Sequence, residues 1–572
     1  MWWFTEKLSF FLQNLLLSTK ILFLQKTLTS NGMKYPIGIQ NFEKIRREGY
    51  VYVDKTQLMW KMVSEGSYYF LSRPRRFGKS LMISTLEAFF SGERELFKGL
   101  YVDSVEWDWQ QYPILHLDLN TEKYDSVEAL ENKLNLFLST LEKAYGKNPD
   151  EKSLGTRFEG IIQRTFEKTG RQAVILVDEY DKPLLQAIGN DSLQTEYRNT
   201  LKAFYGALKS CDRYIKFAFL TGVTNWGKAA SKREQNRACS NYAECEQVRS
   251  KTKVSVFSDL NNLKDISMLP KYTNICGMSE QELHSYFDDS VSALAAANDL
   301  SKEACYERLR QDFDGYYFNE YTKEGIYNPF SLLNTFDSCV FRDYWFETGT
   351  PSFLVYQLQK TGYPLDNMTE EELSADTLNS IDIMDVNPLP LLYQSGYLTI
   401  KEYDPEFKTY RLGFPNREVR EGFIKYLYPF YTPKTQDLGK FAIVHFVKDI
   451  RSGQAEAFMT RLSDFFATGD YQVMGRLEIY LQNTLNVIFN LMGMYVEVER
   501  HTTNGRMDMV IQTPQYVYII ELKIDQTAAV ALQQIEDRGY ANAFAGDARR
   551  LFKIGINFSS EKKLIDDWKI EG

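Results

Sequence analysis

Gly78-Lys79-Ser80 has the residue types that bind the phosphates of a nucleotide. In a P-loop, backbone N–H groups at a helix start hold phosphate oxygens, a lysine reaches the β- and γ-phosphates, and a hydroxyl ligates Mg²⁺. Lys79 and Ser80 would take the last two roles. The usual motif begins with glycine, whereas this chain has Arg73 there. An ordinary helix that starts after a glycine also explains the tripeptide. A second sequence element is therefore needed to choose between a P-loop and an ordinary helix start.

Two acids farther along the chain supply that element. Asp178 and Glu179 follow the continuous apolar run Ala173–Val177, which predicts a buried parallel strand. Acids at the carboxyl end of such a strand lie at the edge where α/β sheets bind ligands. We therefore expect Asp178 to hold the Mg²⁺ shell and Glu179 to orient or deprotonate the attacking water. With the P-loop upstream, the pair favours an NTP site over a solvated acidic turn.

Further polar residues fit the same site. Thr221 ends another apolar run, where ATPases place a residue that senses the γ-phosphate, although a hydroxyl that merely ends a strand explains it too. By hypothesis, the loop arginines, including Arg75, add donors to the phosphate cradle. The residues predicted to bind ATP are Arg73, Arg76, Gly78, Lys79, Ser80 and Thr221, and those predicted to bind its Mg²⁺ are Ser80 and Asp178.

A second group of catalytic residue types lies near the C-terminus. Asp508 stands inside an apolar strand pattern, where a carboxylate is costly without a partner or a task. Glu521 and Lys523 are two apart on the next strand and so share a face, and a hairpin brings Asp508 beside them. This is the chemistry of a metal-dependent nuclease, in which carboxylates hold Mg²⁺, and the metal and the lysine activate water at a phosphate. Glu478 would add a metal ligand, and Gln534 would orient the site. The alternative is a salt-bridged strand end.

The elements around the first site alternate as a doubly wound parallel sheet requires. Helical spacing over Leu81–Phe90 follows the P-loop, and helical segments separate the strands. The predicted strands are Tyr68–Leu71, Tyr112–Leu119, Ala173–Val177 and Tyr214–Gly222. The expected fold class is therefore α/β, of the P-loop NTPase type.

The elements around the second site follow the order α-β-β-β-α-β. They are a helix at Gly475–Met492, strands at Tyr495–Glu499, Arg506–Ile511 and Tyr516–Lys523, a helix at Thr527–Tyr540 and a strand at Leu551–Phe558. This order predicts a restriction-endonuclease-like α/β domain, which favours the nuclease interpretation of the acids.

Composition sets limits on function. The chain has 572 residues, enough for about three or four domains. The net charge of -9 argues against a nucleic-acid surface spread over the whole chain. No Cys-x-x-Cys pair occurs and the histidines are dispersed, so we expect no zinc site and a cytoplasmic location with free thiols. The apolar run Leu8–Leu24 is interrupted by polar residues, so no stable membrane insertion is expected.

Several further motifs resemble those of a bacterial family, the AAA-ATPase-like proteins that carry a C-terminal nuclease-like domain of the PD-(D/E)XK superfamily. The resemblance extends from about Met33 onward. Its motifs are Pro36–Phe42, Tyr52–Thr56, Arg73–Leu81, Val177–Pro183, Tyr344–Pro351, Leu391–Leu398 and Leu412–Asn416. In this family Arg-Pro-Arg-Arg-Phe-Gly-Lys-Ser is the typical form, so Arg73 counts as a variant of the P-loop.

The resemblance implies a domain order. We expect an extension or mis-assigned start at 1–32, an AAA-like ATPase domain at 33–265, a helical lid or winged-helix-like region at 266–430, and the nuclease-like domain at 431–572. A polar, basic insert at about 225–252 departs from the family pattern. It is interpreted as a loop, with a partner-binding loop or a disrupted ATPase as alternatives.

Two functions are compatible with these residues. In the first, a protein that binds ATP and Mg²⁺ hydrolyses the nucleotide and gates the access of DNA or RNA to Asp508, Glu521 and Lys523. In the second, the chain is a nucleotide-dependent switch or scaffold, and an inactive nuclease-like domain binds a protein partner. The acidic net charge motivates the second.

Overall fold

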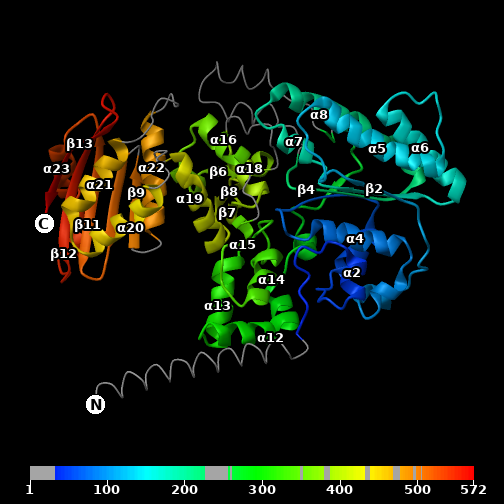
Figure 1. Ribbon diagram of the computed structural model, residues 1–572, viewed down its shortest axis with the longest axis horizontal. Coiled ribbons are helices and arrows are strands. Elements are labelled where there is room, and N and C mark those ends of the chain that lie inside the picture. Colours follow the sequence, from blue (N-terminus) through cyan, green and yellow to red (C-terminus); the bar gives the residue numbers. More distant parts are fainter. Residues whose placement is uncertain are drawn as a thin grey trace, which may run out of the picture. The chain divides into compact units, whose positions relative to one another are not determined.

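Figure 1 shows the computed structural model of the chain. The structure describes residues 32–225, 256–257, 260–347, 352–378, 387–431, 438–467, 477–493, 497–503 and 506–572. Residues 1–31 of the predicted extension and 226–252 of the predicted insert lie outside this set. The chain forms two compact units. The first is built from the described parts of Met1–Pro183, Glu196–Val223 and Phe257–Trp345, and the second from those of Leu184–Thr195, Thr224–Val256 and Phe346–Gly572.

A five-stranded parallel sheet organises the first unit. Its strands are β1 (Tyr68–Ser72), β2 (Ile114–Asp118), β3 (Ala173–Asp178), β4 (Ile215–Gly222) and β5 (Lys264–Asp265). They lie in the order β2-β3-β4-β1-β5, and each neighbouring pair is parallel. Every residue of β3 is buried, as a continuous apolar run predicts for a central parallel strand. The four predicted strands are confirmed, and β5 is an addition.

Helices cover both faces of this sheet. Figure 1 shows α2 (Phe42–Arg47) and α4 (Lys79–Phe90) on one face, and α5 (Val127–Tyr145) and α6 (Leu154–Thr169) on the other. A capping box of Ser153 and Thr156 begins α6. The other helices of this part of the chain are α3 (Thr56–Glu65), η1 (Arg94–Phe97), η2 (Tyr101–Ser104), α7 (Lys182–Gln186), α8 (Asp191–Tyr205), α9 (Ala207–Ser210) and η3 (Asp212–Tyr214).

A helical subdomain completes the first unit. It contains η4 (Pro270–Ile275), α12 (Glu280–Ala297), α13 (Lys302–Phe313), α14 (Pro329–Ser338) and the start of α15 (Tyr344–Glu347). Its apolar core includes Phe287 and Leu309, and Ile37 from the N-terminal segment packs against it. Buried Lys55 donates to both carboxylate oxygens of Glu282 on α12, at 2.6 and 2.7 Å. The Tyr52–Thr56 motif thus ties the N-terminal segment to this subdomain.

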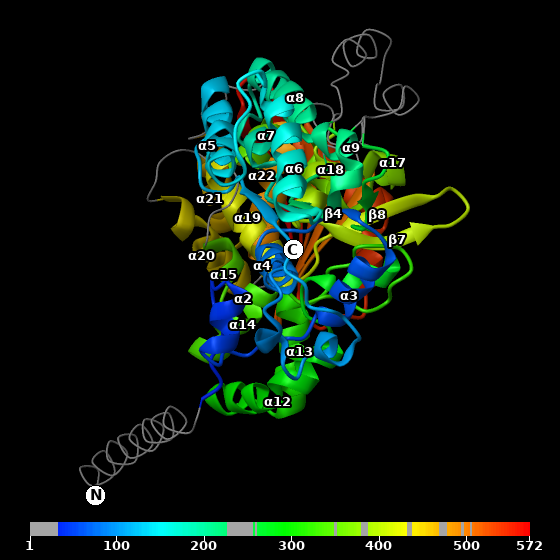
Figure 2. The same ribbon diagram turned by 90° about the vertical axis from the view of Figure 1, so that its right-hand side faces the viewer.

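The first part of the second unit mixes helices with a small sheet. Its elements are α16 (Ser352–Thr361), η5 (Leu365–Thr369), β6 (Glu372–Ser374), α17 (Ala375–Leu378), α18 (Leu389–Gln394), β7 (Thr399–Asp404), β8 (Thr409–Gly413) and α19 (Arg417–Tyr431). The strands form an antiparallel sheet in the order β6-β8-β7. Figure 2 shows the β7–β8 hairpin as a projecting ribbon. Helices therefore make up most of this region, as expected, and a small antiparallel sheet lies among them.

A second five-stranded sheet forms the C-terminal part of the second unit. Its strands are β9 (Glu497–Thr503), β10 (Arg506–Gln512), β11 (Tyr516–Ile524), β12 (Arg550–Ser559) and β13 (Leu564–Glu571). The order is β13-β12-β11-β10-β9, with β11 and β12 parallel and the other neighbours antiparallel. The helices are α20 (Leu438–Arg451), α21 (Ala455–Ala467), α22 (Leu477–Met492), α23 (Ala528–Asp537) and η7 (Tyr540–Phe544). The predicted α-β-β-β-α-β order is confirmed, and β13 extends it.

None of the helices in the described part of the chain combines the length and the apolar character needed to cross a membrane.

Candidate functional site

The loop between β1 and α4 turns through a left-handed glycine. Gly78 has φ of +98°, a conformation that costs glycine little and other residues much, and α4 begins directly after it. The first N–H groups of a helix have no partner within the helix, and they carry the positive end of its dipole. The local fold therefore presents backbone donors beside Lys79 and Ser80, as a phosphate-binding loop requires.

The Lys79 side chain lies inside the loop. Its Nζ donates to the backbone oxygens of Arg73 at 3.0 Å and Pro74 at 3.3 Å, and it lies 3.2 Å from Oε1 of Glu179. Only 3% of this side chain is exposed. Burial acts to raise the pKa of Glu179, but the charges of Lys79 and Arg75 outweigh it and hold that pKa below its usual value. Lys79 and Glu179 therefore form a charged pair at the centre of the site.

Asp178 gathers two hydroxyl groups at the end of β3. The Thr221 hydroxyl donates to Oδ1 of Asp178 at 2.6 Å, and the Ser80 side chain lies close enough to this carboxylate to act on its pKa. Burial raises the pKa of Asp178, the neighbouring charge of Glu179 adds to this, and Ser80, Thr221 and Lys79 oppose it. A hydroxyl and a carboxylate are the hard oxygen ligands that Mg²⁺ prefers. The residues present therefore fit a nucleotide with its magnesium ion.

The turn after β3 is fastened to the end of β4. Glu179 has φ of +52°, and the next residue, Tyr180, donates its N–H to the oxygen of Thr221 at 2.9 Å. The fully buried Asp181 accepts the N–H of Val223 with both oxygens, at 3.2 and 3.1 Å. Asp181 thus fixes Glu179 against β4. Sequence reasoning gave Asp181 no role, although its place in the Asp-Glu-Tyr-Asp-Lys-Pro motif was a usable signal.

The Arg73 side chain donates hydrogen bonds to backbone oxygens. Only 2% of Arg73 is exposed, and its guanidinium donates to the backbone oxygens of Ser267 at 2.7 Å and Tyr272 at 3.3 Å. The Phe318 ring packs 4.0 Å from its Cζ. Through these contacts Arg73 stabilises the backbone around the loop. They give no support to phosphate binding by this side chain. That role stays a prediction.

Arg76 lies at the surface and packs on an aromatic ring. It is exposed, its φ is +70°, and its Cζ lies 4.1 Å from the ring centroid of Phe330. Burial of part of the side chain and the charge of Arg75 lower the pKa of Arg76. The structure therefore brings Lys79, Ser80, Asp178 and Glu179 together with Thr221, whereas the Arg73 guanidinium contacts Ser267 and Tyr272 and that of Arg76 contacts Phe330.

The second candidate site lies on β11 and α23. Glu521 is fully buried, and its Oε1 accepts from Nζ of Lys523 at 2.6 Å. The same Nζ donates to Oε1 of Gln534 on α23. Within the described residues, Oε2 of Glu521 is buried without a hydrogen-bond partner. A buried carboxylate oxygen without a donor is costly, and a divalent cation is a group that would satisfy it. These residues fit a metal ion.

The two other predicted ligands are placed by the backbone. Asp508 on β10 pairs directly with Glu521 on β11, so the register puts both residues on one face of the sheet. Glu478 lies in the first turn of α22. The side chains of Asp508 and Glu478 lie outside the described set. Among the described side chains, no group of three or more His, Cys, Asp or Glu residues is arranged to hold a metal ion.

Comparisons with known proteins match both regions. Residues 36–230 match the family model described as "Predicted AAA-ATPase", and residues 476–568 match that of the PD-(D/E)XK nuclease superfamily. The chain is also 32% identical over 554 residues to "Uncharacterized protein in vnfD 5'region" of Azotobacter chroococcum mcd 1. That alignment covers 94% of this chain and 99% of the relative.

Proposed function

Because the chain belongs to the family of AAA-ATPase-like proteins with a C-terminal PD-(D/E)XK nuclease superfamily domain, we propose that it hydrolyses ATP with Mg²⁺ and couples this to a nuclease-like domain that acts on nucleic acid. The convergence of Lys79, Ser80, Asp178 and Glu179 at one edge of the parallel sheet carries the proposal. The strand order and the helices on both faces support a doubly wound P-loop fold.

Each side chain has a task in the proposed reaction. Bound Mg²⁺ would be held by Ser80 and Asp178 and would neutralise charge on the phosphates. Lys79 has to leave Glu179 to reach the β- and γ-phosphates. Glu179 then orients a water, whose oxygen bonds to the γ-phosphorus while the bond to the bridging oxygen breaks. The water proton passes to the Glu179 carboxylate, and ADP and phosphate leave. Thr221 keeps Asp178 oriented through its 2.6 Å hydrogen bond.

We assign the ATPase to residues 33–265, a lid or winged-helix-like region to 266–430, and the nuclease-like domain to 431–572. In that last domain, Asp508, Glu521 and Glu478 would hold a metal ion, and Lys523, oriented by Gln534, would stabilise charge at the scissile phosphate. The unpartnered Oε2 of Glu521 supports this role.

Two substitutions test the two sites. Lys79→Ala should abolish ATP binding in calorimetric titration, whereas Lys209→Ala, which removes an exposed lysine of α9, should not. Asp508→Ala should abolish Mg²⁺-dependent cleavage of DNA or RNA without lowering the thermal unfolding midpoint. If the wild-type protein cuts neither nucleic acid with any divalent metal, the nuclease half of the proposal is wrong.

A second candidate function is a nucleotide-dependent switch whose nuclease-like domain binds a protein partner without cutting. The hydrogen bonds from Lys523 to Glu521 and Gln534 favour it, because they stabilise the buried group without a metal. ATP binding without cleavage, combined with ATP-dependent capture of a defined protein partner, would support the switch. Loss of cleavage in Asp508→Ala would exclude it.

A further inference from the structure

Two cationic side chains flank the Lys79–Glu179 pair from different loops. Arg75 follows Pro74, whose oxygen accepts from Lys79, and the Arg75 oxygen itself accepts from Nε1 of Trp345 at 3.3 Å. Lys182 follows the acidic turn, and its N–H donates to the oxygen of Glu179 at 3.0 Å. The backbone at both positions is therefore held by hydrogen bonds. Because the loops bearing them meet at Lys79 and Glu179, the two cations belong to one site.

Neither cationic side chain is held by a direct contact within the described part of the chain. The side chains of Arg75 and Lys182 make no hydrogen bond or ion pair there, although both are half-buried. Both charges act on Glu179. Burial lowers the pKa of Lys182, and the nearby charge of Arg75 lowers it further, against the opposing effect of the Glu179, Asp181 and Asp118 carboxylates. Like charges held close together in a partly desolvated place repel each other, and a bound anion would lower this cost beyond what the nearby carboxylates do.

The other cations of the loop are engaged. The Arg73 guanidinium is bonded to backbone oxygens beneath the loop, and the Arg76 guanidinium packs on the Phe330 ring. Lys79 is needed at the β- and γ-phosphates. Among the cations of the described residues that act on Glu179, Arg75 and Lys182 are therefore left to meet the outer oxygens of the terminal phosphate.

We propose that Arg75 and Lys182 together bind the terminal phosphate of the nucleotide and stabilise the negative charge that develops on it during hydrolysis. This inference rests on the proposed ATPase function. The pair would do within one chain what an arginine finger does in other P-loop enzymes. ADP lacks the phosphate that the two cations meet, so they distinguish ATP from ADP.

The test is the ratio of ATP to ADP affinity, measured with Mg²⁺ by calorimetry on the full chain. Arg75→Ala and Lys182→Ala should each weaken ATP binding by about tenfold and leave the ADP dissociation constant within about twofold. The hydrolysis rate of bound ATP should fall by about a hundredfold or more in each variant. Lys209→Ala, at an exposed position on α9, should match wild type in both measurements.

Charge-conserving variants separate this role from a structural one. Arg75→Lys and Lys182→Arg should keep more of the ATP preference than the alanine variants, and they serve as the test if an alanine variant fails to fold. Unchanged ATP-to-ADP ratios and rates in folded alanine variants would overturn the inference while leaving the ATPase proposal intact. Unchanged ATP binding in Lys79→Ala would instead overturn the ATPase proposal.

Discussion

At the scale of single residues, Arg73 has contacts that differ from those its motif predicts. The motif predicts phosphate binding, whereas the observed contacts are structural. Arg73 stands where a P-loop usually has glycine, yet its guanidinium is buried against the oxygens of Ser267 and Tyr272. Arg73→Ala leaves those buried oxygens without a donor, so the free energy of unfolding should fall by about 2–3 kcal/mol. Chemical denaturation measures this. ATP affinity of the folded variant should stay within a few-fold of wild type, and a loss as large as that of Lys79→Ala would show that Arg73 acts on the nucleotide.

Asp178 gives a prediction about pH. Its pKa is raised in the folded chain by burial and by Glu179, so the ionised carboxylate costs stability once the pH exceeds the folded pKa. That cost is absent below the usual value of 3.8 and grows as the pH rises through the folded pKa. Asp178→Asn should therefore raise the Tm of the nucleotide-free protein at pH 8, and the gain should shrink on acidification. A lower Tm than wild type at pH 8 would contradict this account, while ATP hydrolysis should be lost in either case.

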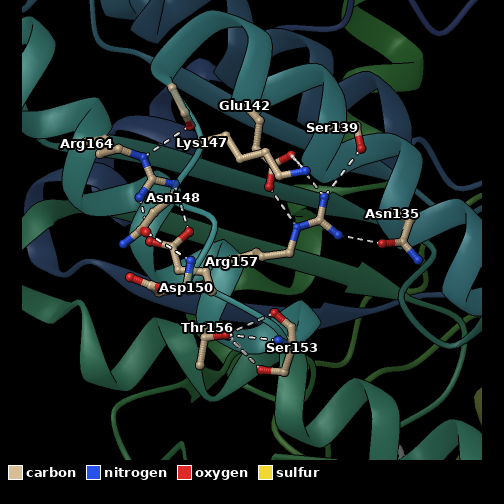
Figure 3. Close-up of polar contacts among 12 residues, drawn as sticks. Asn135, Ser139, Glu142, Lys147, Asn148, Asp150, Ser153, Thr156, Arg157 and Arg164 are labelled. Atoms are coloured by element: carbon tan, nitrogen blue, oxygen red, sulfur yellow. Dashed lines mark hydrogen bonds and ion pairs between the residues drawn. The ribbon is translucent and has the colours of Figure 1, made fainter.

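At the scale of elements, a polar clamp joins α5 and α6, the two helices on one face of the parallel sheet. The clamp consists of Arg157 and its hydrogen-bond partners. Figure 3 shows Arg157 of α6 reaching Glu142, Asn135 and Ser139 of α5. Its two bonds to the Glu142 carboxylate measure 2.7 and 3.1 Å, and 7% of Glu142 is exposed. These hydrogen bonds hold the pKa of Glu142 below its usual value.

Arg157→Ala leaves the buried Glu142 carboxylate without its two hydrogen bonds from Arg157 and with only a 4.0 Å ion pair to exposed Lys147, so the free energy of unfolding should fall by about 2–4 kcal/mol at neutral pH. Because the folded pKa of Glu142 is depressed, the clamp stabilises above the usual glutamate pKa and weakens as the pH falls through the folded pKa. The difference between variant and wild type should therefore narrow in acid. Denaturant melts at several pH values measure it. Lys98→Ala, which breaks an exposed pair with Glu95, should change stability by less than about 0.5 kcal/mol.

The elements that the sequence predicted are those with a clear hydrophobic pattern or with a glycine that marks a helix start. The apolar run of β3 and the Gly-Lys-Ser helix start are visible from neighbouring residues alone. In contrast, β13 alternates weakly and is mostly partly exposed, and β5 has two residues, so local hydropathy cannot reveal either strand. The burial of Arg73 depends on Ser267, far along the chain, which no local pattern encodes. Asp508 and Glu521 were predicted to be neighbours because a hairpin would pair their strands. The backbone register agrees with this prediction.

At the scale of the whole molecule, the proposed nucleotide site and the proposed metal site lie in different compact units of the chain. The nuclease-like fold shares its unit with the α16–α19 region, and α22 joins them. Asn483 of α22 accepts the N–H of Leu365 and donates to the oxygen of Tyr363, each at 2.8 Å. Thr484 donates to the oxygen of Tyr431 on α19. The helix that carries Glu478 is therefore docked on the middle region by buried hydrogen bonds, and a movement of that region would displace it.

The docking of α22 predicts which substitution should uncouple nucleic-acid cleavage from ATP. Asn483→Ala removes both bonds to the start of η5 and the residues before it and leaves buried backbone groups unpaired, which should cost about 2–3 kcal/mol in stability. If α22 carries the nucleotide signal, the variant should hydrolyse ATP at the wild-type rate but cleave nucleic acid at a rate that no longer depends on ATP. Asn490→Ala, on the last turns of the same helix, removes only an exposed 3.4 Å hydrogen bond from Arg420 of α19 and bonds to Asn486 within the helix, so it should retain the dependence. Full ATP dependence in a folded Asn483→Ala protein would show that the signal reaches Asp508 and Glu521 by a route other than α22.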